Sequence, residues 1–460
     1  MDFWNKDTLQ EALANAKFYN FPENWSSNGM VIWQDNYESG NMVLIRTPGQ
    51  TKGMFAEKHE DIIQKCAALI ANKPQGLYKY NKPIVELPYG NGEALIKMAR
   101  YIRKHFSGKV VAVTGSSGKS TTTQMLTDVF SSKYPTDSNA GNRANVTWGI
   151  TWNMTRFNPD SRYWIIETSL GGGMSKNSAI TKPDYAIILN VAPVHITGTM
   201  TLQSIAEEKS RIFHAMENSG IAVLYSEMTY FDIVKEAANF KNLKILTFGE
   251  SETADVRVVT GSENKFIIDG KTYILNSEPV GKHLLLDMAA TLTVAKSENI
   301  NIEDTLNVLR KFKTLKGRGE TFDILIDGDK KVTIVDESYN ANPLSMKSAI
   351  IAFGEKYYDK NKILVIGDMA ECGEETEKYH RGIASAISEI SPQKVLLCGK
   401  DIKFLYEEIK DKYNTKYYTT VEELKTNLNQ NFNDNDCVLV KSSHSGNMHK
   451  IITALEQYKI

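Results

Sequence analysis

One short stretch constrains this chain more than any other: a strand-like run followed at once by a glycine-rich loop and a helix. Residues 109–130 read KVVAVTGSSGKSTTTQMLTDVF. Residues 109–113 are mostly apolar and β-branched, as in a buried strand, and the segment after Lys119 has the spacing of an amphipathic helix. Glycine lets the backbone wrap closely, and consecutive N–H groups at a helix N-terminus face an anion. The stretch therefore predicts an α/β fold with a mononucleotide site at this turn.

The residue types of this loop fit the chemistry of ATP binding. Lys119 is expected to reach the β- and γ-phosphates, and the Ser120 hydroxyl is placed to bind Mg²⁺. The residue five before Gly118 is Val113, so the spacing differs from that of the common Walker loop. The alternative is a turn that is rich in Gly and Ser for structural reasons alone, and the GKS run between strand and helix disfavours it. The expected nucleotide contacts here are Gly115, Ser116, Ser117, Gly118, Lys119, Ser120 and Thr121.

Strand-like and helix-like runs alternate through most of the 460 residues, a length that suggests about three domains. We expect an α/β protein with mainly parallel sheets. Within the first hundred residues we expect a strand over 42–46 and helices over 54–70 and 92–105. The predicted domains are a small N-terminal α/β domain (1–107), a central P-loop ATPase-like domain (108–316) and a C-terminal Rossmann-like domain (317–460).

Composition narrows the class of protein. The 54 Lys and Arg residues nearly balance the 55 Asp and Glu residues, which argues against nucleic acid as a partner. The apolar runs are too short to span a bilayer, and the first ten residues lack the pattern of a secretory signal. The four cysteines show no CxxC spacing, which argues against zinc and disulfides. We therefore expect a cytoplasmic protein without a membrane span.

Three polar residues follow the phosphate loop at the ends of predicted elements. Glu167 closes one predicted strand, His195 follows the next, and Lys209 lies on the helix after it. A carboxylate at the carboxyl edge of a parallel sheet lies where ligands bind, and it can hold phosphate-bound Mg²⁺. Taken singly, each residue also has an ordinary explanation as a surface charge, a loop cap or a solvated lysine. Their order after the loop favours a functional site.

That order, with the loop form TGxxGK[ST], resembles the Mur ligase family. The resemblance implies that Glu167 holds one Mg²⁺ and that His195 helps to hold a second. It also implies that Lys209 is carbamylated, which turns a cation into an oxygen ligand. Arg318, in the run LKGRGE, would approach the ATP phosphates when the domains close, although an exposed linker arginine is the alternative. The implied catalytic residues are Lys119, His195, Lys209 and Arg318, and the implied metal ligands are Ser120, Glu167, His195 and Lys209.

Three motifs of the last domain resemble one branch of that family, the branch that adds D-alanyl-D-alanine to a UDP-muramoyl tripeptide. They are DESYNANPLSM at 336–346, GDMAECG at 367–373 and VKSS at 440–443. Asn342 and Pro343 also have the chemistry of the N-cap and first residue of a helix. The resemblance implies further ATP contacts from His283, Asp287, Arg318, Asp336, Tyr339 and Asn340. It implies substrate contacts from Asn142, Asn145, Asn342, Pro343, Asp368, Glu371, Lys441 and Ser443.

Several positions depart from the branch pattern. The first domain has WSSNGM at 25–30 where the branch carries a D-S-R run that grips the nucleotide sugar. The run GKHLLLD at 281–287 keeps His283 of the pattern G-x-H-N-x-x-N and replaces both asparagines, by Leu284 and Asp287. The resemblance therefore implies a divergent substrate-binding first domain and a last domain that binds the amine.

The implied function is an ATP-dependent ligase that joins a carboxylate to an amine through an acyl phosphate and releases ADP and phosphate. Its partners would be two small-molecule substrates, its cofactors ATP and two Mg²⁺ ions, and its state a monomer, as for most of the family. One alternative is a repurposed ligase of a specialised pathway that acts on a carboxylate without UDP. Others, less favoured, are an ATP-binding regulator without catalysis and a folylpolyglutamate-type ligase.

Overall fold

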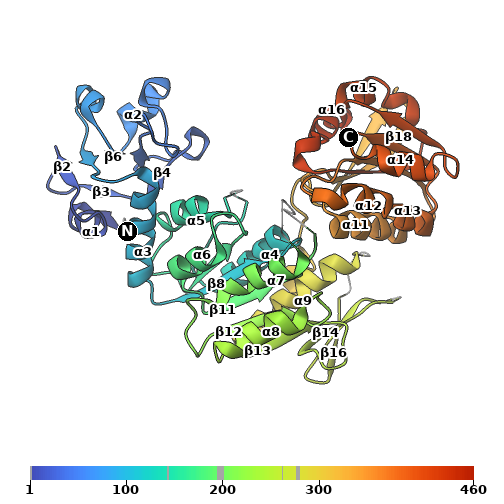
Figure 1. Cartoon of the computed structure of the whole chain (residues 1–460), viewed down its shortest axis with the longest axis horizontal. Helices are drawn as coiled ribbons and strands as arrows, with labels where there is room; N and C mark the ends of the chain where they lie inside the picture. Colours follow the sequence, from blue (N-terminus) through green and yellow to red (C-terminus); the bar gives the residue numbers. More distant parts are fainter. Residues whose placement is uncertain (1–2, 142–143, 194–200, 262, 276–279) are drawn as a thin grey trace.

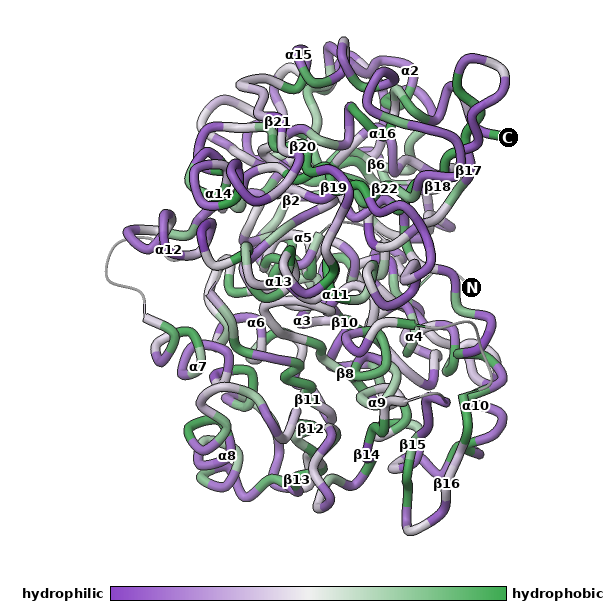
Figure 2. Tube along the Cα trace, turned by 90° about the vertical axis from the view of Figure 1, so that its right-hand side faces the viewer, coloured by the Kyte–Doolittle hydropathy of each residue, from purple (hydrophilic) through white to green (hydrophobic). Residues whose placement is uncertain are grey.

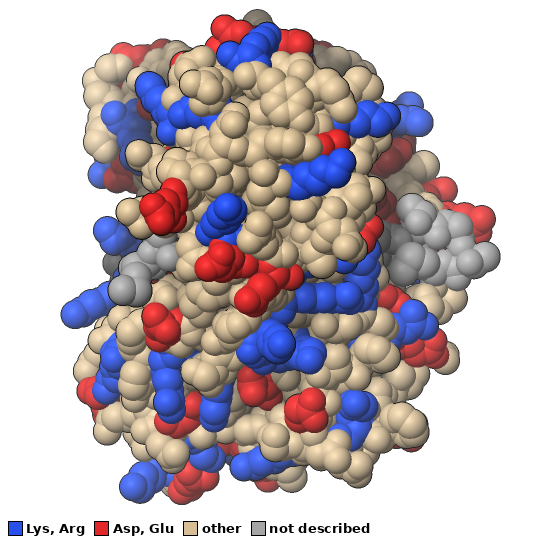
Figure 3. Space-filling model, turned by 90° about the vertical axis from the view of Figure 1, so that its left-hand side faces the viewer, with Lys and Arg blue, Asp and Glu red and all other residues tan. Residues whose placement is uncertain are grey.

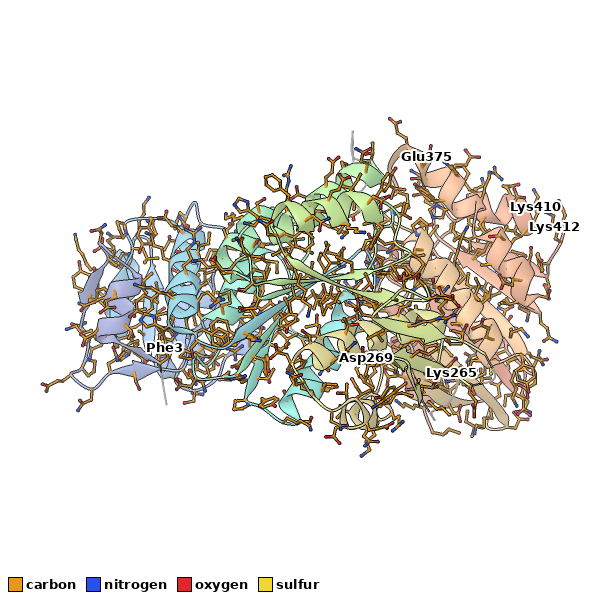
Figure 4. All side chains as sticks on the ribbon, turned by 90° about the horizontal axis from the view of Figure 1, so that it is seen from below. Phe3, Lys265, Asp269, Glu375, Lys410 and Lys412 are labelled. Atoms are coloured by element: carbon orange, nitrogen blue, oxygen red, sulfur yellow. The ribbon has the colours of Figure 1, made fainter. Side chains whose placement is uncertain are left out.

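The computed structural model describes residues 3–141, 144–193, 201–261, 263–275 and 280–460, and it forms three blocks along a bent, elongated body (Figure 1). The first block runs from β1 (Trp4–Asn5) to α3 (Asn91–His105). The central block runs from β8 (Lys109–Thr114) to α10 (Ile302–Leu309). The third block runs from β17 (Glu320–Ile326) to α16 (His449–Leu455). Seen from below, Phe3 lies near one end of the body and Lys410 and Lys412 near the other (Figure 4).

The first block holds a five-stranded sheet in the order β2-β7-β6-β5-β4, parallel except for β2. Its strands are β2 (Lys17–Tyr19), β4 (Met30–Val31), β5 (Met42–Leu44), β6 (Ala68–Ala71) and β7 (Ile84–Glu86), and β1 pairs with β3 (Ser26–Ser27). Its helices are α1 (Lys6–Ala12), α2 (Glu60–Lys65) and α3. The prediction of a helix over 54–70 is wrong, because the range holds a short 3-10 helix (Ala56–Lys58), then α2, and Ala68–Ala71 is a buried parallel strand. The predicted strand at 42–46 and helix at 92–105 are present.

The central block is built on a nine-stranded sheet in the order β16-β15-β14-β13-β12-β11-β8-β10-β9. The strands from β8 to β14 run parallel, and β15 and β16 add an antiparallel extension that the sequence did not predict. The strands besides β8 are β9 (Thr136–Ser138), β10 (Tyr163–Glu167), β11 (Tyr185–Ile188), β12 (Ile221–Tyr225), β13 (Lys244–Gly249), β14 (Val256–Val259), β15 (Lys265–Ile268) and β16 (Lys271–Ile274). The helices besides α10 are α4 (Lys119–Ser131), α5 (Thr147–Met154), α6 (Met174–Thr181), α7 (Leu202–Ser210), α8 (Phe231–Phe240) and α9 (Lys282–Ser297).

The third block holds a six-stranded sheet in the order β17-β18-β22-β19-β20-β21, parallel except for β17. Its apolar strands lie inside more hydrophilic loops and helices (Figure 2). The strands besides β17 are β18 (Lys330–Glu337), β19 (Asn361–Gly367), β20 (Lys394–Cys398), β21 (Thr415–Tyr418) and β22 (Asp436–Lys441). The helices besides α16 are α11 (Pro343–Lys356), α12 (Thr376–Arg381), α13 (Ala384–Ile390), α14 (Lys403–Ile409) and α15 (Val421–Thr426). The mainly parallel α/β architecture is confirmed.

The blocks differ in how they are joined. One continuous apolar core includes Trp4 and Ile102 of the first block together with Trp152 and Trp164 of the central block. Indole N–H groups cross the same boundary, because Trp4 donates to the Thr155 carbonyl at 2.7 Å and Trp152 to the Met30 carbonyl at 2.7 Å. The two cores of the third block, in contrast, contain only residues from 322 onward. The first and central blocks are therefore one packed unit, and the third has a core of its own.

Three further features concern the surface charge, the length of the helices and the cysteines. The face seen in Figure 3 carries cationic and anionic side chains interspersed, without a large area of one sign. None of the described helices combines the length and the apolar character needed to cross a membrane. All four cysteines are buried free thiols.

Candidate active site

The phosphate loop joins β8 to α4 at the carboxyl edge of the central sheet. Gly118 has φ +81° and lies so close to α9 that a β-carbon on it would be 2.4 Å from the Asp287 Oδ1. Glycine is therefore required by conformation and by space. The Lys119 ammonium folds back over the loop and donates to the Gly115 carbonyl at 2.8 Å. Burial lowers the pKa of Lys119, and the nearby Glu167 carboxylate opposes that effect.

A residue that the sequence did not predict, Asn190, holds the first half of this loop. Its Oδ1 accepts from the backbone N–H groups of Ser116 and Ser117 at 3.0 and 2.9 Å. Its Nδ2 donates to the Ser117 carbonyl at 3.2 Å. Asn190 follows β11, which pairs with β8, so the register of the sheet delivers the amide to the loop. The one signal in the sequence was a polar residue at the end of the apolar run 185–189.

Glu167 ends β10, the strand on the other side of β8, and it is only 6% exposed. Its Oε2 accepts from the Ser120 hydroxyl at 2.7 Å and its Oε1 accepts from the Asn145 Nδ2 at 2.7 Å. Asn139 fixes the backbone at the same place, accepting from the Glu167 N–H at 2.7 Å. The structure thus brings together a hydroxyl and a carboxylate that the sequence predicted as metal ligands, with an amide orienting the carboxylate. Asn145, predicted to contact substrate, has Glu167 as its partner here.

Lys209 lies on α7 with only 1% of its surface exposed. Burial lowers the pKa of Lys209 well below its usual range, and the charge of Lys119 lowers it further. Among the residues that the structure describes, no carboxylate lies within ion-pair distance of its ammonium. Burial without a counter-ion among the described residues favours the neutral form of an amine, and a neutral amine is a nucleophile. His195 and Asn142, two other predicted site residues, lie outside the described residues.

Arg318 and Asp287, both predicted to contact ATP, lie close enough for the charge of Arg318 to act on the Asp287 carboxyl group. The guanidinium of Arg318 lies 4.0 Å from the centre of the Tyr339 ring, and the Tyr339 N–H donates to the Gly317 carbonyl at 3.0 Å. Asp287 is 6% exposed, and burial raises its pKa to about 8 although Thr122 and Arg318 oppose the rise. His283 lies on the first turn of α9 and is exposed.

The predicted third-block residues gather at the carboxyl edge of its sheet, on the ends of strands and on the segments that follow them. Lys441 is buried and pairs with Glu337 at 3.0 Å while donating to the Asn340 carbonyl at 3.1 Å. The Ser443 hydroxyl accepts from the Ala370 N–H at 2.7 Å and donates to the Ala341 carbonyl at 3.0 Å, so it ties all three motifs together.

Other predicted residues of this edge have structural partners. The Asp368 carboxylate accepts from the N–H groups of Lys400 and Ile402 at 2.9 and 2.7 Å, and it therefore holds the loop after β20. Asp336 is buried and accepts from the Ser338 N–H at 3.0 Å. Glu371 is exposed and adopts a left-handed backbone with φ +59°. Asn342 and Pro343 begin α11, which confirms the predicted helix cap.

A cavity of about 490 Å³ opens in the first block beside α5 of the central block. Aromatic and polar side chains line it, among them Trp33, Asp35, Phe55, His59 and Trp148. The Lys52 ammonium lies 4.3 Å from the centre of the Trp148 ring. The cavity has the aromatic walls and polar groups that suit a planar or sugar-like ligand, in a block that lacks the branch's polar run at 25–30.

Comparisons with known proteins agree with this geometry. Residues 113–295 match the Mur ligase middle domain, and residues 317–444 match the glutamate ligase domain of Mur ligases. A UDP-N-acetylmuramoyl-tripeptide–D-alanyl-D-alanine ligase from Rickettsia prowazekii is 28% identical over 459 residues, covering 98% of this chain and 99% of that protein. The ligase of the same name from Buchnera aphidicola (Baizongia pistaciae) is 30% identical over 374 residues, covering 79% and 78%.

Solved structures show the same fold. The crystal structure of MurF from Acinetobacter baumannii matches with a TM-score of 0.82 at 20% identity, covering 99% of both chains. MurF from Thermotoga maritima in complex with ADP matches with a TM-score of 0.74 at 21% identity, covering 94% of this chain and 97% of that one.

Proposed function

This chain belongs to the Mur ligase family of ATP-dependent amide-bond ligases, and we propose that it joins D-alanyl-D-alanine to a UDP-N-acetylmuramoyl tripeptide. The observation that carries the proposal is the match to the Rickettsia ligase over 98% of this chain and 99% of that protein. That match includes the first block, where the sequence departs most from the branch pattern. In this proposal the predicted domains 1–107, 108–316 and 317–460 bind the carboxylate substrate, ATP and the amine, respectively.

The proposed reaction has two chemical steps. An oxygen of the substrate carboxylate attacks the γ-phosphorus of ATP, which forms an acyl phosphate and releases ADP. The amine then attacks the acyl carbon, the C–N bond forms, and inorganic phosphate leaves as the amine gives up a proton. The loop N–H groups and Lys119 bind the phosphates, and Arg318 offsets the negative charge on the transferred group.

The residues at the end of β10 fit a magnesium ion. Ser120 and Glu167 present a hydroxyl and a carboxylate at 2.7 Å from each other, and both are oxygen donors of the kind that Mg²⁺ prefers. The remaining positions would be filled by phosphate oxygens and water. When bound, Mg²⁺ neutralises charge on the phosphates of ATP. A second ion near His195 and Lys209 is part of the proposal.

Carbamylation of Lys209 is also proposed. Its support is the burial of the amine and the lowered pKa, which together provide the neutral nucleophile that attack on carbon dioxide requires. The product would be an oxygen ligand in place of an amine that has no carboxylate partner among the described residues. A cytoplasmic location and action as a monomer complete the proposal, and the four buried free thiols fit a reducing compartment.

The test is product formation by the purified protein. ATP, Mg²⁺, UDP-N-acetylmuramoyl tripeptide and D-alanyl-D-alanine are supplied, ADP release is followed, and mass spectrometry identifies the product. Formation of the UDP-muramoyl pentapeptide is expected. The Lys119→Ala variant is the control, because loss of the phosphate-binding ammonium should abolish ADP release. Absence of the pentapeptide, with ADP release on another carboxylate and amine, would overturn the substrate assignment in favour of a repurposed ligase.

A further inference from the structure

Asn342 performs two separate tasks with the two atoms of its side-chain amide. Its Oδ1 accepts from the Ser345 N–H at 2.8 Å, and the Ser345 hydroxyl accepts from the Asn342 N–H at 3.0 Å, which together form a capping box on α11. Its Nδ2 points out of the third block and donates to the Ser116 carbonyl of the phosphate loop at 3.4 Å. The residue is 6% exposed, so water does not compete freely for this contact.

The carbonyl that Asn342 contacts belongs to the same planar peptide unit as the Ser117 N–H. Asn190 accepts from that N–H at 2.9 Å. The two asparagines therefore hold the two ends of one peptide unit, Asn190 from the central block and Asn342 from the third block. Because the unit is rigid, the direction of its carbonyl determines the direction of its N–H.

We propose that Asn342 is a positioning residue that orients the Ser116–Ser117 peptide unit for nucleotide binding when the third block docks on the phosphate loop. Docking then changes the nucleotide site itself, in addition to delivering the amine. Two further observations show that the third block lies against the central block here. A β-carbon on Gly281 of α9 would be 2.5 Å from the Ala352 Cβ of α11, and the charge of Arg318 acts on Lys119 and Asp287 of the central block.

The role of this contact in ligation rests on the proposed function, whereas its effect on nucleotide affinity does not. A ligase that must avoid hydrolysis of an acyl phosphate benefits when the phosphate site is complete only in the docked state. Nucleotide affinity can be measured with neither the carboxylate nor the amine present. Failure of the peptide substrates would therefore leave this test intact.

The test separates the two tasks of the side chain. Asn342→Asp keeps an oxygen for the Ser345 N–H, and Asp is as good an N-cap as Asn, but it places a second oxygen against the Ser116 carbonyl. Ser345→Ala weakens the same cap and leaves the loop contact in place. Asn342→Ser is a second variant that can cap the helix without an amide donor. Binding of a non-hydrolysable ATP analogue with Mg²⁺ is measured by calorimetry, and the melting temperature of each variant is recorded.

Asn342→Asp and Asn342→Ser are expected to weaken analogue binding by roughly three- to tenfold, the contribution of one hydrogen bond, with little change in melting temperature. Ser345→Ala is expected to lower the melting temperature and to leave the affinity unchanged. Wild-type affinity in both Asn342 variants would overturn the proposal. An equal loss of affinity in Ser345→Ala would also overturn it, because the helix cap alone would then explain the effect.

Discussion

Replacing Asp287 by asparagine changes one oxygen to an amide at a buried site and is expected to alter how stability depends on pH. The carboxyl group lies on α9, is 6% exposed and faces Gly118 of the phosphate loop. Burial raises its pKa to about 8, and Thr122 and Arg318 limit the rise. At neutral pH the group is therefore mostly protonated in the folded protein, where it presents one donor and one acceptor as an asparagine would.

The sign follows from proton binding in the two states. In the unfolded chain the carboxyl ionises near pH 4, whereas in the folded protein it stays protonated up to about pH 8. Between these values the folded state holds one more proton, so the free energy of unfolding falls by about 1.4 kcal/mol for each pH unit. From pH 6 to pH 8 this one group removes roughly 2–3 kcal/mol, which corresponds to about 5–10 °C in melting temperature for a domain of about 150–250 residues. An asparagine side chain cannot ionise, so this contribution to the slope should vanish in Asp287→Asn.

The assay is thermal unfolding of both proteins from pH 6 to pH 9. The melting temperature of Asp287→Asn should exceed that of the wild type by an amount that grows as the pH rises to 8. A constant difference across this range would refute the reasoning, because the carboxyl group would then have an ordinary pKa in the folded state. The same ionisation puts a negative charge beside the loop, so the KM of the wild type for ATP should rise above pH 8 while that of Asp287→Asn does not.

Three further predictions concern other residues. Asn145→Ala removes the donor that orients Glu167, and the Mg²⁺ concentration for half-maximal ADP release should rise about tenfold or more. The buried carboxylate of Glu298, at the opposite edge of the sheet, pairs with Lys109 and accepts from the hydroxyls of Tyr163 and Tyr185. Glu298→Gln should therefore lower the free energy of unfolding in urea by about 1–3 kcal/mol and leave ADP release unchanged. Tyr339→Leu removes the ring beneath Arg318 and should slow ligation by roughly fivefold. Tyr339→Phe keeps the ring and should keep most of the rate. Equal rates in the two variants would contradict a role for the contact between Arg318 and the ring.

The phosphate loop was predictable because all of its information is local. A buried strand, a glycine with positive φ and a lysine that begins a helix are encoded in one continuous segment, and the structure has all three. The cap of α11 was predictable for the same reason, since Asn342 and Pro343 carry that signal by themselves. Glu167 required one further rule, that ligands bind at the carboxyl edge of a parallel sheet.

Contacts between distant segments were not predictable. Asn190 and Asn342 meet the loop only through the register of β11 on β8 and through docking of the third block. The helix expected over 54–70 failed for a different reason. Ala68–Ala71 is a continuous apolar run that is buried on both faces of a parallel sheet, and such a run has no periodicity that distinguishes strand from helix. The roles assigned to His195 and Asn142 stay predictions.

The core that spans the first two blocks has a consequence for how this enzyme can be altered. Trp152 and Trp164 are completely buried in a core shared with the first hundred residues, and indole hydrogen bonds cross in both directions. A chimera that imports the substrate-binding domain of a relative at residue 107 would have to match that packing residue by residue, or it would expose tryptophan to water. Single substitutions around the cavity beside Trp148, in contrast, would leave the shared core intact. The third domain has a core of its own, so a replacement would have to match its surface contacts with the central block, such as that of Asn342 with the Ser116 carbonyl, rather than a shared core.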